Sequence, residues 1–392
     1  MKRLLRVGII GAGMMGEQHT EAIRRIPGTE VAALADVNPA RAQELCDRLQ
    51  IPKWYDNYLE MIEKEHLDVV HNCTPNYMHF EINKALIERG IPVYSEKPLG
   101  MNSAETGELC LLAKEKNVKT AVNFNYRQNA IIREMHERIC TEREKPDNKW
   151  GRTFLVHGTY IQDWMLYDTD YSWRCEKDVG GESRAVVDIG SHWFDAVRYI
   201  TGVGVKRVNA KLITVYPQRK KFKNQALTFG TASGDDYELV DVENEDAAMI
   251  MLEFEDGSFG DLLVSQVSAG HKNDFEINVD GSNYSMSWNQ ENTDKIIIND
   301  RVSGRTTRYA GPDMLSAGAR NYGTLPSGHP VGWQDALRNA INGFYDNLRD
   351  GTPGNFATFV NGDYVTRVVE ACLRSAKSGQ WEELQLVKGI NY

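Results

Sequence analysis

A glycine-rich loop near the start of the chain constrains its fold more than any other feature. Gly11, Gly13 and Gly16 follow a short apolar segment at residues 6–10 and precede a segment with helical periodicity at 18–26. In a strand–loop–helix turn with this spacing, the first glycine allows a tight turn, the second lets a ligand approach the backbone, and the third lets helix and strand pack closely. The pattern predicts the first turn of a Rossmann-type, doubly wound domain.

Strand and helix segments continue to alternate over the first 125 or so residues. The expected strands lie at 31–36, 69–73, 92–95 and 120–123, and the expected helices at 39–49, 58–64, 79–89 and 103–116. Apolar strands that alternate with helices predict a parallel sheet covered on both faces. We therefore expect a dinucleotide-binding Rossmann domain over residues 1–125.

Beyond residue 150 the expected strands become longer and their polar and apolar residues alternate. They lie at 154–161, 247–254, 258–267, 275–280, 284–288 and 295–299, interrupted by a helix at 191–201 and followed by helices at 332–349 and 359–378. The charged segment 142–149 marks a seam between domains. We expect an α/β chain whose C-terminal domain, residues 126–392, carries a large, mainly antiparallel sheet.

Composition excludes several classes of protein. The net charge of −10 over 392 residues argues against nucleic-acid binding, and no run approaches 18 consecutive apolar residues, which argues against a membrane span. The six cysteines are scattered without ligand spacing, as expected of free thiols in a reducing compartment, so we expect a cytoplasmic protein. A basic cluster at Arg219, Lys220, Lys221 and Lys223 is predicted to be a solvated loop.

Asp36 strengthens the prediction of a dinucleotide site. It ends the second expected strand 20 residues after Gly16, where a carboxylate can accept hydrogen bonds from an adenosine ribose. A carboxylate there would repel the additional phosphate of NADP, so we expect NAD. Arg41 could flank the adenine or be a solvated helix residue; the sequence leaves both interpretations open.

A second polar cluster follows the expected strand 69–73. Thr74, Pro75, Asn76 and His79 stand at the carboxyl end of that strand, the edge at which open α/β sheets bind ligands. Asn76 is also a suitable N-cap for the helix at 79–89. The two interpretations are compatible.

Two further groups could move a proton beside the dinucleotide. Glu96 and Lys97 precede Pro98 at the end of the strand 92–95, and a lysine near a positive nicotinamide can act as an acid, a base or a hydroxyl-orienting donor. The alternative is a surface ion pair between Glu96 and Lys97. Asp188 and His192 are four residues apart, so on a helix the carboxylate could orient the imidazole, unless they are merely a cap and a packed ring. The sequence near Asp188 and His192 offers no third residue that could complete a metal site, so we expect no metal there.

Aromatic and polar side chains of the kind that bind sugars surround these groups in the sequence. Aromatic faces cover the C–H faces of a pyranose, and polar groups bind its hydroxyls. They are Tyr126, Arg127, Tyr160, Gln162, Asp163, Trp164, Trp173, Arg174, His329 and Trp333.

Taken together, these motifs resemble those of the Gfo/Idh/MocA oxidoreductases, which include glucose–fructose oxidoreductase and inositol dehydrogenase. The resemblance rests on the glycine loop, Asp36, the 74–79 cluster, Glu96-Lys97-Pro98, the segment 125–127, Asp188 with His192, and the segment 328–330. It implies a C-terminal α/β domain whose open sheet serves substrate binding and oligomerisation. It also implies a tightly held NAD(H) and catalytic roles for Lys97, Asp188 and His192. Segments 160–164, 171–174 and 183–185 are similar to those of a glycoside 3-oxidoreductase subgroup.

The residues expected at each ligand follow from these motifs and the resemblance. Those expected at the cofactor are Gly11, Gly13, Met14, Met15, Gly16, Asp36, Arg41, Thr74, Pro75, Asn76, His79, Glu96, Lys97 and Asn125. Those expected at the substrate are Tyr126, Arg127, Tyr160, Gln162, Trp164, Trp173, Arg174, Asp188, His192 and His329.

The leading hypothesis is oxidation of a secondary hydroxyl of a sugar or glycoside, at C3 of a glucosyl unit, with hydride passing to NAD. Three alternatives stay open: an inositol or polyol dehydrogenase, a glycosidase that oxidises C3 transiently, and a non-catalytic nicotinamide sensor. One face of the long strands at 247–254 and 258–267 has few helices to cover it, so we also expect a homodimer or a larger even-numbered assembly.

Overall fold

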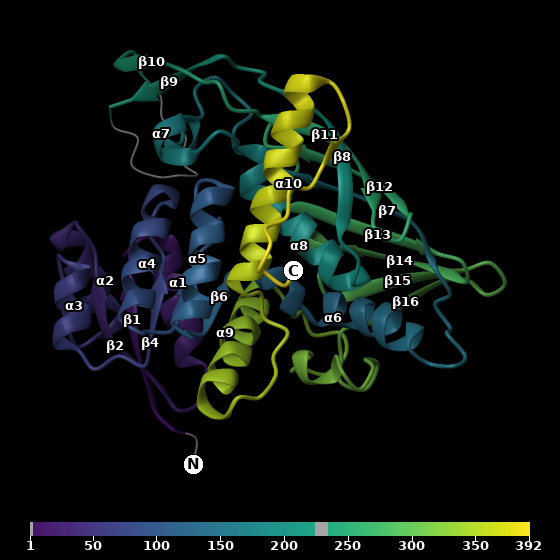
Figure 1. The fold of residues 1–392 in the computed structure, drawn as a ribbon, viewed down its shortest axis with the longest axis horizontal. Helices are drawn as coiled ribbons and strands as arrows, with labels where there is room; N and C mark the ends of the chain where they lie inside the picture. Colours follow the sequence, from purple (N-terminus) through teal and green to yellow (C-terminus); the bar gives the residue numbers. More distant parts are fainter. Residues whose placement is uncertain (1–2, 224–233) are drawn as a thin grey trace. The chain divides into compact units, whose positions relative to one another are not determined.

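The structure is a computed structural model that describes residues 3–223 and 234–392. The chain forms two compact units (Figure 1). The first comprises Met1–Gln128, Trp333–Tyr364 and Val387–Tyr392, and the second comprises Asn129–Gly332 and Val365–Leu386. The assignment of cofactor binding to residues 1–125 and of substrate binding to 126–392 stays a prediction.

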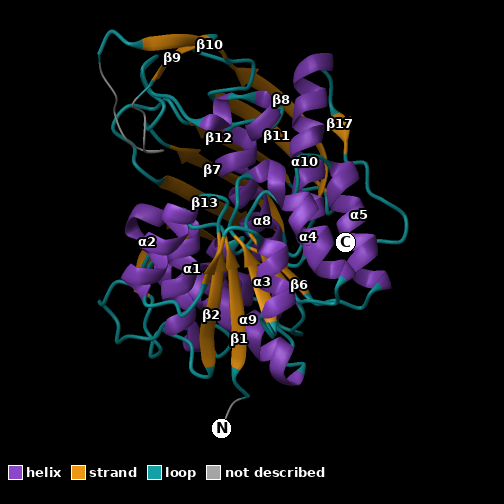
Figure 2. Ribbon diagram, turned by 90° about the vertical axis from the view of Figure 1, so that its left-hand side faces the viewer, coloured by secondary structure: helices purple, strands orange, loops and turns teal. Residues whose placement is uncertain are grey.

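The first unit contains a parallel sheet. Within the described residues it has six strands in the order β3-β2-β1-β4-β5-β6, and helices lie on both sides of the strands (Figure 2). The strands are β1 (Leu5–Ile10), β2 (Thr29–Ala35), β3 (Trp54–Tyr55), β4 (Val69–Asn72), β5 (Val93–Ser95) and β6 (Thr120–Val122). The helices are α1 (Met14–Arg24), α2 (Pro39–Leu49), α3 (Tyr58–Lys64), α4 (His79–Glu88), α5 (Ser103–Glu115) and α9 (Trp333–Asp350). This strand order is that of a doubly wound dinucleotide-binding fold, as predicted.

The carboxyl ends of these strands meet at one edge of the sheet. The backbone N–H of Gly11 donates to Ala35 at 2.7 Å, and that of Cys73 donates to Ile10 at 2.7 Å. Further along, the N–H of Glu96 donates to the carbonyl oxygen of Asn72 at 2.8 Å. The hydrogen-bonded ladder therefore brings the glycine loop, the segment after β4 and the segment after β5 to the same edge.

Helix α9 completes the core of the first unit although it lies more than 200 residues beyond β6. Its apolar side chains Leu337, Ala340, Ile341 and Phe344 are buried in the same cluster as residues of β1, β2 and β4. The apolar face that a Rossmann sheet must cover is thus covered in part by a segment from late in the chain.

The second unit contains a large mixed sheet. Among the described residues it has nine strands in the order β16-β15-β14-β13-β7-β12-β11-β8-β17, and only the neighbours β7 and β12 are parallel. The strands are β7 (Thr153–Ile161), β8 (Val205–Ile213), β11 (Ala247–Phe254), β12 (Phe259–Ser265), β13 (Asp274–Gly281), β14 (Tyr284–Asn289), β15 (Lys295–Asp300), β16 (Gly304–Tyr309) and β17 (Glu382–Glu383). The helices of this part of the chain include α6 (Ala130–His136), α7 (Lys177–Gly180), α8 (Ser191–Thr201) and α10 (Phe359–Ser378), the last of which also contributes its first turns to the first unit. The mainly antiparallel sheet predicted from the alternating segments is confirmed.

Some local predictions were wrong. Helix α1 begins at Met14 rather than at residue 18, because Gly13 serves as its N-cap and the helix starts directly after the glycine loop. The strands β8 and β16 were not predicted. The basic cluster is not a solvated loop: its first three residues lie in strand β9 (Gln218–Phe222), which pairs with β10 (Tyr237–Asp241), and Arg219 is completely buried.

Two further observations concern the chain as a whole. All six cysteines fall within the described ranges and are free thiols, as predicted. Over residues 3–223 and 234–392 the structure has no helix that is long and apolar enough to cross a membrane.

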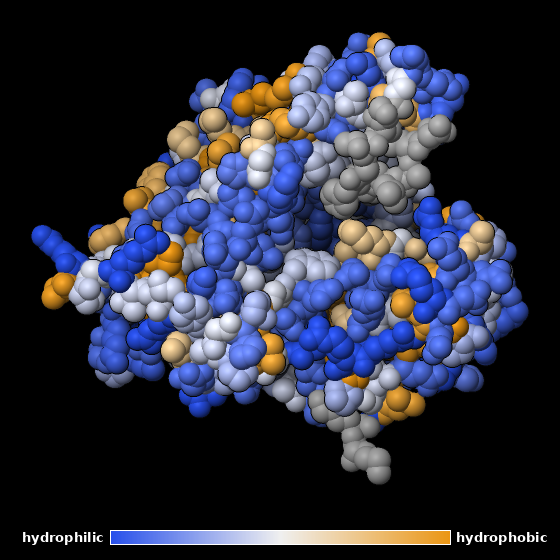
Figure 3. All heavy atoms as spheres, turned by 180° about the vertical axis from the view of Figure 1, so that it is seen from behind, coloured by the Kyte–Doolittle hydropathy of each residue, from blue (hydrophilic) through white to orange (hydrophobic). Residues whose placement is uncertain are grey.

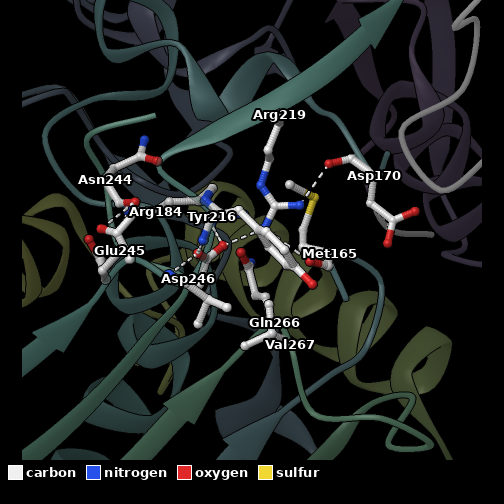
Figure 4. Close-up of polar contacts among 12 residues, drawn as sticks. Met165, Asp170, Arg184, Tyr216, Arg219, Asn244, Glu245, Asp246, Gln266 and Val267 are labelled. Carbon is white, nitrogen blue, oxygen red and sulfur yellow. Dashed lines mark hydrogen bonds and ion pairs between the residues drawn. The ribbon is translucent and has the colours of Figure 1, made fainter. Parts of the chain in front are cut away.

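Asp246 explains why Arg219 is buried. Asp246 directly precedes β11. Its carboxylate pairs with two completely buried guanidinium groups, those of Arg184 and Arg219 (Figure 4). Its second oxygen accepts backbone N–H groups of Val215 at 2.6 Å and Tyr216 at 3.2 Å. Burial alone would raise the pKa of Asp246, but the two guanidinium groups outweigh burial and hold its pKa below the ordinary value.

Arg219 in turn fixes the segment that follows β7. Its guanidinium donates to the carbonyl oxygens of Met165 at 3.0 Å, Tyr167 at 2.7 Å and Asp170 at 2.9 Å. A segment without regular structure needs such partners for its backbone, since unpaired carbonyls away from water are costly. Asp246 therefore positions, through Arg219, the stretch that carries Trp164 and its neighbours.

Removal of the Asp246 charge should destabilise the second unit. In Asp246→Asn two buried guanidinium groups lose their counter-charge, a loss worth about 3–5 kcal/mol, which for a unit of this size lowers the melting temperature by about 10 °C. Asp241→Asn, which alters an exposed strand carboxylate, should change stability by less than about 0.5 kcal/mol. Differential scanning calorimetry of both variants makes the comparison, and equal melting temperatures would contradict the role given to Asp246.

Candidate functional site

The glycine loop forms a concave turn between β1 and α1. Gly11 has a φ of +103°, a conformation that side chains rarely adopt, and a Cβ there would lie 2.6 Å from the carbonyl oxygen of Cys73. A Cβ at Gly16 would lie 1.9 Å from the carbonyl oxygen of Gly11, so this glycine lets the helix pack closely on the loop. A Cβ at Gly13 would meet nothing within 4 Å. The open space beside Gly13, at the N-terminus of α1, is suited to a phosphate.

Asp36 shapes the same loop from the end of β2. Its carboxylate accepts the backbone N–H of Ala12 at 2.7 Å and that of Asn38 at 2.8 Å. Each carboxylate oxygen can accept a second hydrogen bond. Because Asp36 is only half-buried, a ribose hydroxyl can reach these oxygens. Arg41, on the first turn of α2, is exposed, and its backbone N–H donates to the Asn38 side chain that caps the helix.

Asn125 supplies an independent indication that a polar ligand belongs at this edge. It lies after β6 in the short helix Asn125–Gln128 and is 1% exposed. Its side-chain Nδ2 atom has no hydrogen-bond partner among the described residues. A buried donor left without an acceptor costs about 1–3 kcal/mol. The residues present therefore fit a dinucleotide, whose phosphates would lie beside Gly13, a ribose at Asp36 and a polar group at Asn125.

The segment after β4 is held by its own buried side chains. Thr74 donates through its hydroxyl to Asn72 Oδ1 at 2.7 Å. His79 is completely buried, with Nδ1 2.5 Å from the carbonyl oxygen of Pro98 and Nε2 2.8 Å from that of Thr74. Burial lowers the pKa of His79, so the neutral ring donates one of these two bonds at a time. We infer that His79 supports the cofactor edge and does not offer a ring nitrogen to the cofactor.

Asn76 does not cap the following helix. It lies inside the 3₁₀ turn Asn76–Met78, whose N-cap is Pro75, and α4 begins only at His79, after Met78. The capping interpretation of Asn76 is therefore wrong, because the 3₁₀ turn separates Asn76 from the helix and Met78 occupies the N-cap position. The buried Asn76 stays a predicted cofactor residue.

Glu96 and Lys97 differ in their surroundings. Glu96 is 6% exposed, and its Oε1 atom accepts from His19 Nε2 at 2.8 Å and from Asn123 Nδ2 at 2.6 Å. Its Oε2 atom accepts the backbone N–H of Lys97 at 3.2 Å. Glu96 is thus a buried group, not half of a surface ion pair, while Lys97 is half-buried at the cofactor edge. The peptide bond between Lys97 and Pro98 is cis.

Asp188 and His192 occupy a wide turn and the helix that follows it. Asp188 lies in the π-helical turn Val186–Gly190, and His192 lies in the first turn of α8. The Asp188 carboxylate accepts from Gln266 Nε2 at 3.0 Å and lies 3.5 Å from Arg174 Nε. A carboxylate held in place by an amide and a guanidinium keeps further lone pairs with which it can accept a substrate hydroxyl.

Sequence reasoning did not identify the partner of Asp188. Gln266 follows β12, in a stretch whose alternation indicated only a strand end. Nothing in its neighbours distinguishes it from a solvated glutamine. Glu245, which accepts the backbone N–H of Val186 at 2.8 Å and so supports the turn that carries Asp188, was missed for the same reason.

Several predicted substrate residues contact one another after β7. The hydroxyl of Tyr160 and the amide of Gln162 donate to Asn273 Oδ1 at 2.7 and 3.0 Å, and Trp164 Nε1 donates to Gln162 at 3.0 Å. The guanidinium of Arg174 lies 4.5 Å from the ring centre of Trp173. Asn273 was another residue that the sequence did not single out.

The other predicted substrate residues are more dispersed. Tyr126 and Arg127 are buried in the first unit, whereas His329 is exposed in a loop of the second unit, with Nδ1 3.0 Å from the Pro326 carbonyl. Among the described residues, no group of three or more His, Cys, Asp or Glu could hold a metal ion.

Two glycine substitutions separate binding from folding. Gly13→Ala adds a methyl group in open space at a φ of −79°, so stability should hold while the dissociation constant for NADH rises about tenfold or more, because the methyl group occupies the phosphate approach. Gly16→Ala forces its Cβ against a carbonyl oxygen and should destabilise the first unit by about 2 kcal/mol or more. Calorimetric titration measures the dissociation constant for NADH, and thermal melting measures the stability of each variant. A Gly13→Ala protein that binds NADH like the wild type would contradict this phosphate position.

Comparison with known proteins gives the family. Residues 5–124 match the model of the oxidoreductase family with an NAD-binding Rossmann fold, and residues 146–287 match that of the GFO/IDH/MocA C-terminal domain. The two matches together span more than half of the chain and agree with the fold of each unit.

Individual relatives agree with this result. The levoglucosan dehydrogenase of Pseudarthrobacter phenanthrenivorans is 28% identical over 399 residues, which cover 97% of this chain and 98% of that protein. The D-glucoside 3-dehydrogenase of Escherichia coli is 27% identical over 208 residues, 53% of this chain and 57% of that protein. A solved structure of levoglucosan dehydrogenase in complex with NADH and levoglucosan superposes with a TM-score of 0.85 at 27% identity, covering 98% of this chain and 100% of that one.

The family, the fold class and the cofactor predicted from the sequence are confirmed. This chain belongs to the Gfo/Idh/MocA family of NAD-dependent oxidoreductases.

Proposed function

We propose that this enzyme oxidises a secondary hydroxyl of a sugar or glycoside, the C3 hydroxyl of a glucosyl unit, and passes the hydride to NAD. The observation that carries the proposal is similarity over nearly the whole chain to a levoglucosan dehydrogenase. Partial similarity to a D-glucoside 3-dehydrogenase supports C3 as the position. The linked polar and aromatic groups at Tyr160, Gln162 and Trp164 have the chemistry that binds a pyranose.

The proposed proton chemistry uses three side chains. His192 removes the hydroxyl proton, since an imidazole titrates near neutral pH and a general base contributes about 10²–10⁴-fold. Asp188 orients the ring and binds a substrate hydroxyl, and its bonds to Gln266 and Arg174 keep it an acceptor. Lys97 positions the reacting hydroxyl and relays its proton. NAD, when bound, supplies the acceptor for the hydride.

We propose that the cofactor is held by the glycine loop, Asp36 and Asn125. Gly11, Gly13 and Gly16 form the phosphate turn, Asp36 binds the ribose, and Asn125 donates its buried amide to the bound group. We also propose that NAD(H) is tightly bound.

Substrate and roles can be tested together. Incubation with NAD and a panel of glucosides, anhydrosugars, inositols and other polyols should give a 3-keto product by mass spectrometry, with NADH formed in equal amount. Lys97→Met and His192→Ala should each lower kcat by about 10²-fold or more while NADH still binds. His157→Ala, which alters a half-exposed histidine of β7, is the matched control and should leave kcat unchanged.

The outcomes of the panel exclude one another. Exclusive oxidation of inositols would make the enzyme a polyol dehydrogenase. Release of free aglycone without net NADH would indicate transient oxidation, and absence of hydride transfer with every compound would indicate a sensor. Near wild-type turnover in Lys97→Met or His192→Ala would contradict the assigned roles.

We also propose that the large sheet of the second unit forms a homodimer or a larger even-numbered assembly. Met249 and Met251 of β11, Phe259 of β12 and Leu155 of β7 are exposed, and the strand register puts them on one face. Figure 3 is turned by 180° from Figure 1, and in it apolar residues gather along the upper left edge. This edge corresponds to the right-hand side of Figure 1, where β7, β11 and β12 are labelled. Exposed apolar groups on adjacent strands favour association in water.

We also propose a cytoplasmic location, which the free cysteines fit.

The assembly can be measured directly. Light scattering at micromolar concentration should give the mass of a dimer or larger even-numbered oligomer for the wild type. Met249→Glu with Met251→Glu should reduce that mass, because two charges would be buried against the partner. Lys211→Glu is a milder change at a residue that pairs with Met249 across the same face, so it should have the smaller effect. A monomeric wild type would rule the assembly out.

A further inference from the structure

A line of buried polar side chains runs from Glu96 through the core of the first unit. His19 Nε2 of α1 lies 2.8 Å from Glu96 Oε1, and His19 Nδ1 lies 2.7 Å from His71 Nδ1 of β4. The other ring nitrogen of His71 lies 2.7 Å from the hydroxyl of Tyr345 on α9. Of these four residues, Glu96 is 6% exposed and the other three are completely buried.

Packing alone does not account for this line. Tyr94 stacks on His71 with ring centres 4.7 Å apart, and Tyr94 and Tyr345 both belong to the apolar cluster of the first unit. Apolar side chains would fill this space without the cost of removing imidazole and carboxylate groups from water. A fully bonded buried network, by contrast, fixes its members in one arrangement.

The direction of the first bond follows from the surroundings of Glu96. The Tyr94 hydroxyl donates to Asn123 Oδ1 at 3.0 Å, which sets the orientation of the Asn123 amide. Asn123 Nδ2 therefore donates to Glu96 Oε1 at 2.6 Å. With the backbone N–H of Lys97 at its other oxygen, Glu96 acts as an acceptor on both sides, so His19 donates from Nε2.

The remaining bonds then have a consistent order. In a neutral His19 the Nδ1 atom accepts, so His71 donates from Nδ1 and accepts at Nε2 from the Tyr345 hydroxyl. Burial, with His19 beside it, holds the pKa of His71 well below the ordinary value, so its ring is neutral. Every donor in the line has an acceptor, and the donors all point toward Glu96.

We propose that His19, His71 and Tyr345 are positioning residues that hold the Glu96 carboxylate in place as an acceptor, and that Glu96 thereby fixes Lys97 through its backbone N–H. The proposal rests on the proposed function, in which Lys97 handles the substrate proton. Burial by itself would raise the pKa of Glu96, but the hydrogen bonds from His19 and Asn123 and the charge of Lys97 hold that pKa below the ordinary value. The carboxylate is therefore ionised at neutral pH.

Two variants at the far end of the line test the proposal with the whole enzyme. Tyr345→Phe removes one hydroxyl, and His71→Phe keeps a ring to stack on Tyr94 while removing both bonds. We expect kcat to fall about threefold to tenfold in the first and about tenfold or more in the second, since a small displacement of a catalytic group can cost up to about 10²-fold. The KM for the sugar should change less than about threefold.

The matched control is Tyr55→Phe. The Tyr55 hydroxyl donates to the buried Glu65 carboxylate at 2.7 Å in the same unit, outside the line. It should lose a similar amount of stability without a change in kcat. Lower kcat in the two line variants but not in Tyr55→Phe supports positioning. The positioning role is overturned if both line variants keep the wild-type kcat, or if Tyr55→Phe loses as much kcat as they do.

A second measurement does not depend on turnover. Proton NMR of the wild type should show two imidazole N–H resonances far downfield of the amides, from His19 Nε2 and His71 Nδ1, and His71→Phe should lose one of them. If the wild type oxidises no compound of the panel, the proposed function fails, and the NMR result still decides the line. Absence of both resonances in the wild type overturns it.

Discussion

A charge removed from water must be paired and hydrogen-bonded, and this constraint shapes both units of the enzyme. In the second unit the Asp246 carboxylate is surrounded by two buried guanidinium groups and two backbone amides. In the first unit the Glu96 carboxylate is surrounded by an imidazole, a side-chain amide and a backbone amide. Each arrangement can be satisfied by only one conformation of the segments that supply the donors.

These segments carry the groups assigned to chemistry. Arg219 binds the backbone of the stretch after Trp164, and the backbone carbonyl of Arg184 accepts the N–H of Asp188 at 2.8 Å. Glu96 binds the backbone N–H of Lys97. Of the side chains assigned to proton transfer, Lys97 and Asp188 are partly buried and His192 is 9% exposed. They lie just after β5, in the turn before α8 and in the first turn of α8. Rigid buried supports behind accessible reactive groups reduce the reorganisation that a reaction requires.

The groups that stay unsatisfied or exposed indicate where other molecules bind. The open space beside Gly13 and the unpartnered Asn125 amide, the latter established over the described residues, lie at the carboxyl edge of the parallel sheet. The exposed methionines Met249 and Met251 lie on one face of the large sheet. An unpaired buried amide favours a polar ligand, and an exposed apolar face favours another protein surface, so the two features support different proposals.

The sequence by itself determined the features that depend on local geometry. The spacing of Gly11, Gly13 and Gly16, with Asp36 one strand later, predicted a Rossmann turn because strand, turn and helix are adjacent in the chain. Lys97 was placed at a strand end for the same reason. The period-two alternation at 247–254 and 258–267 predicted an antiparallel pair, and β11 and β12 form it.

Only the tertiary structure decided which distant residues share a core. Arg219 lies in a basic run that indicated solvent, yet it is buried because it pairs with Asp246, which directly precedes β11. Residues 333–364 complete the first unit because its sheet has an apolar face to cover, which sequence distance does not reveal. His71 meets Tyr345 across 274 residues, and Asn76 lies in a 3₁₀ turn instead of capping α4. Local patterns fix periodicity and turns, whereas the partner of a buried charge depends on which elements pack together.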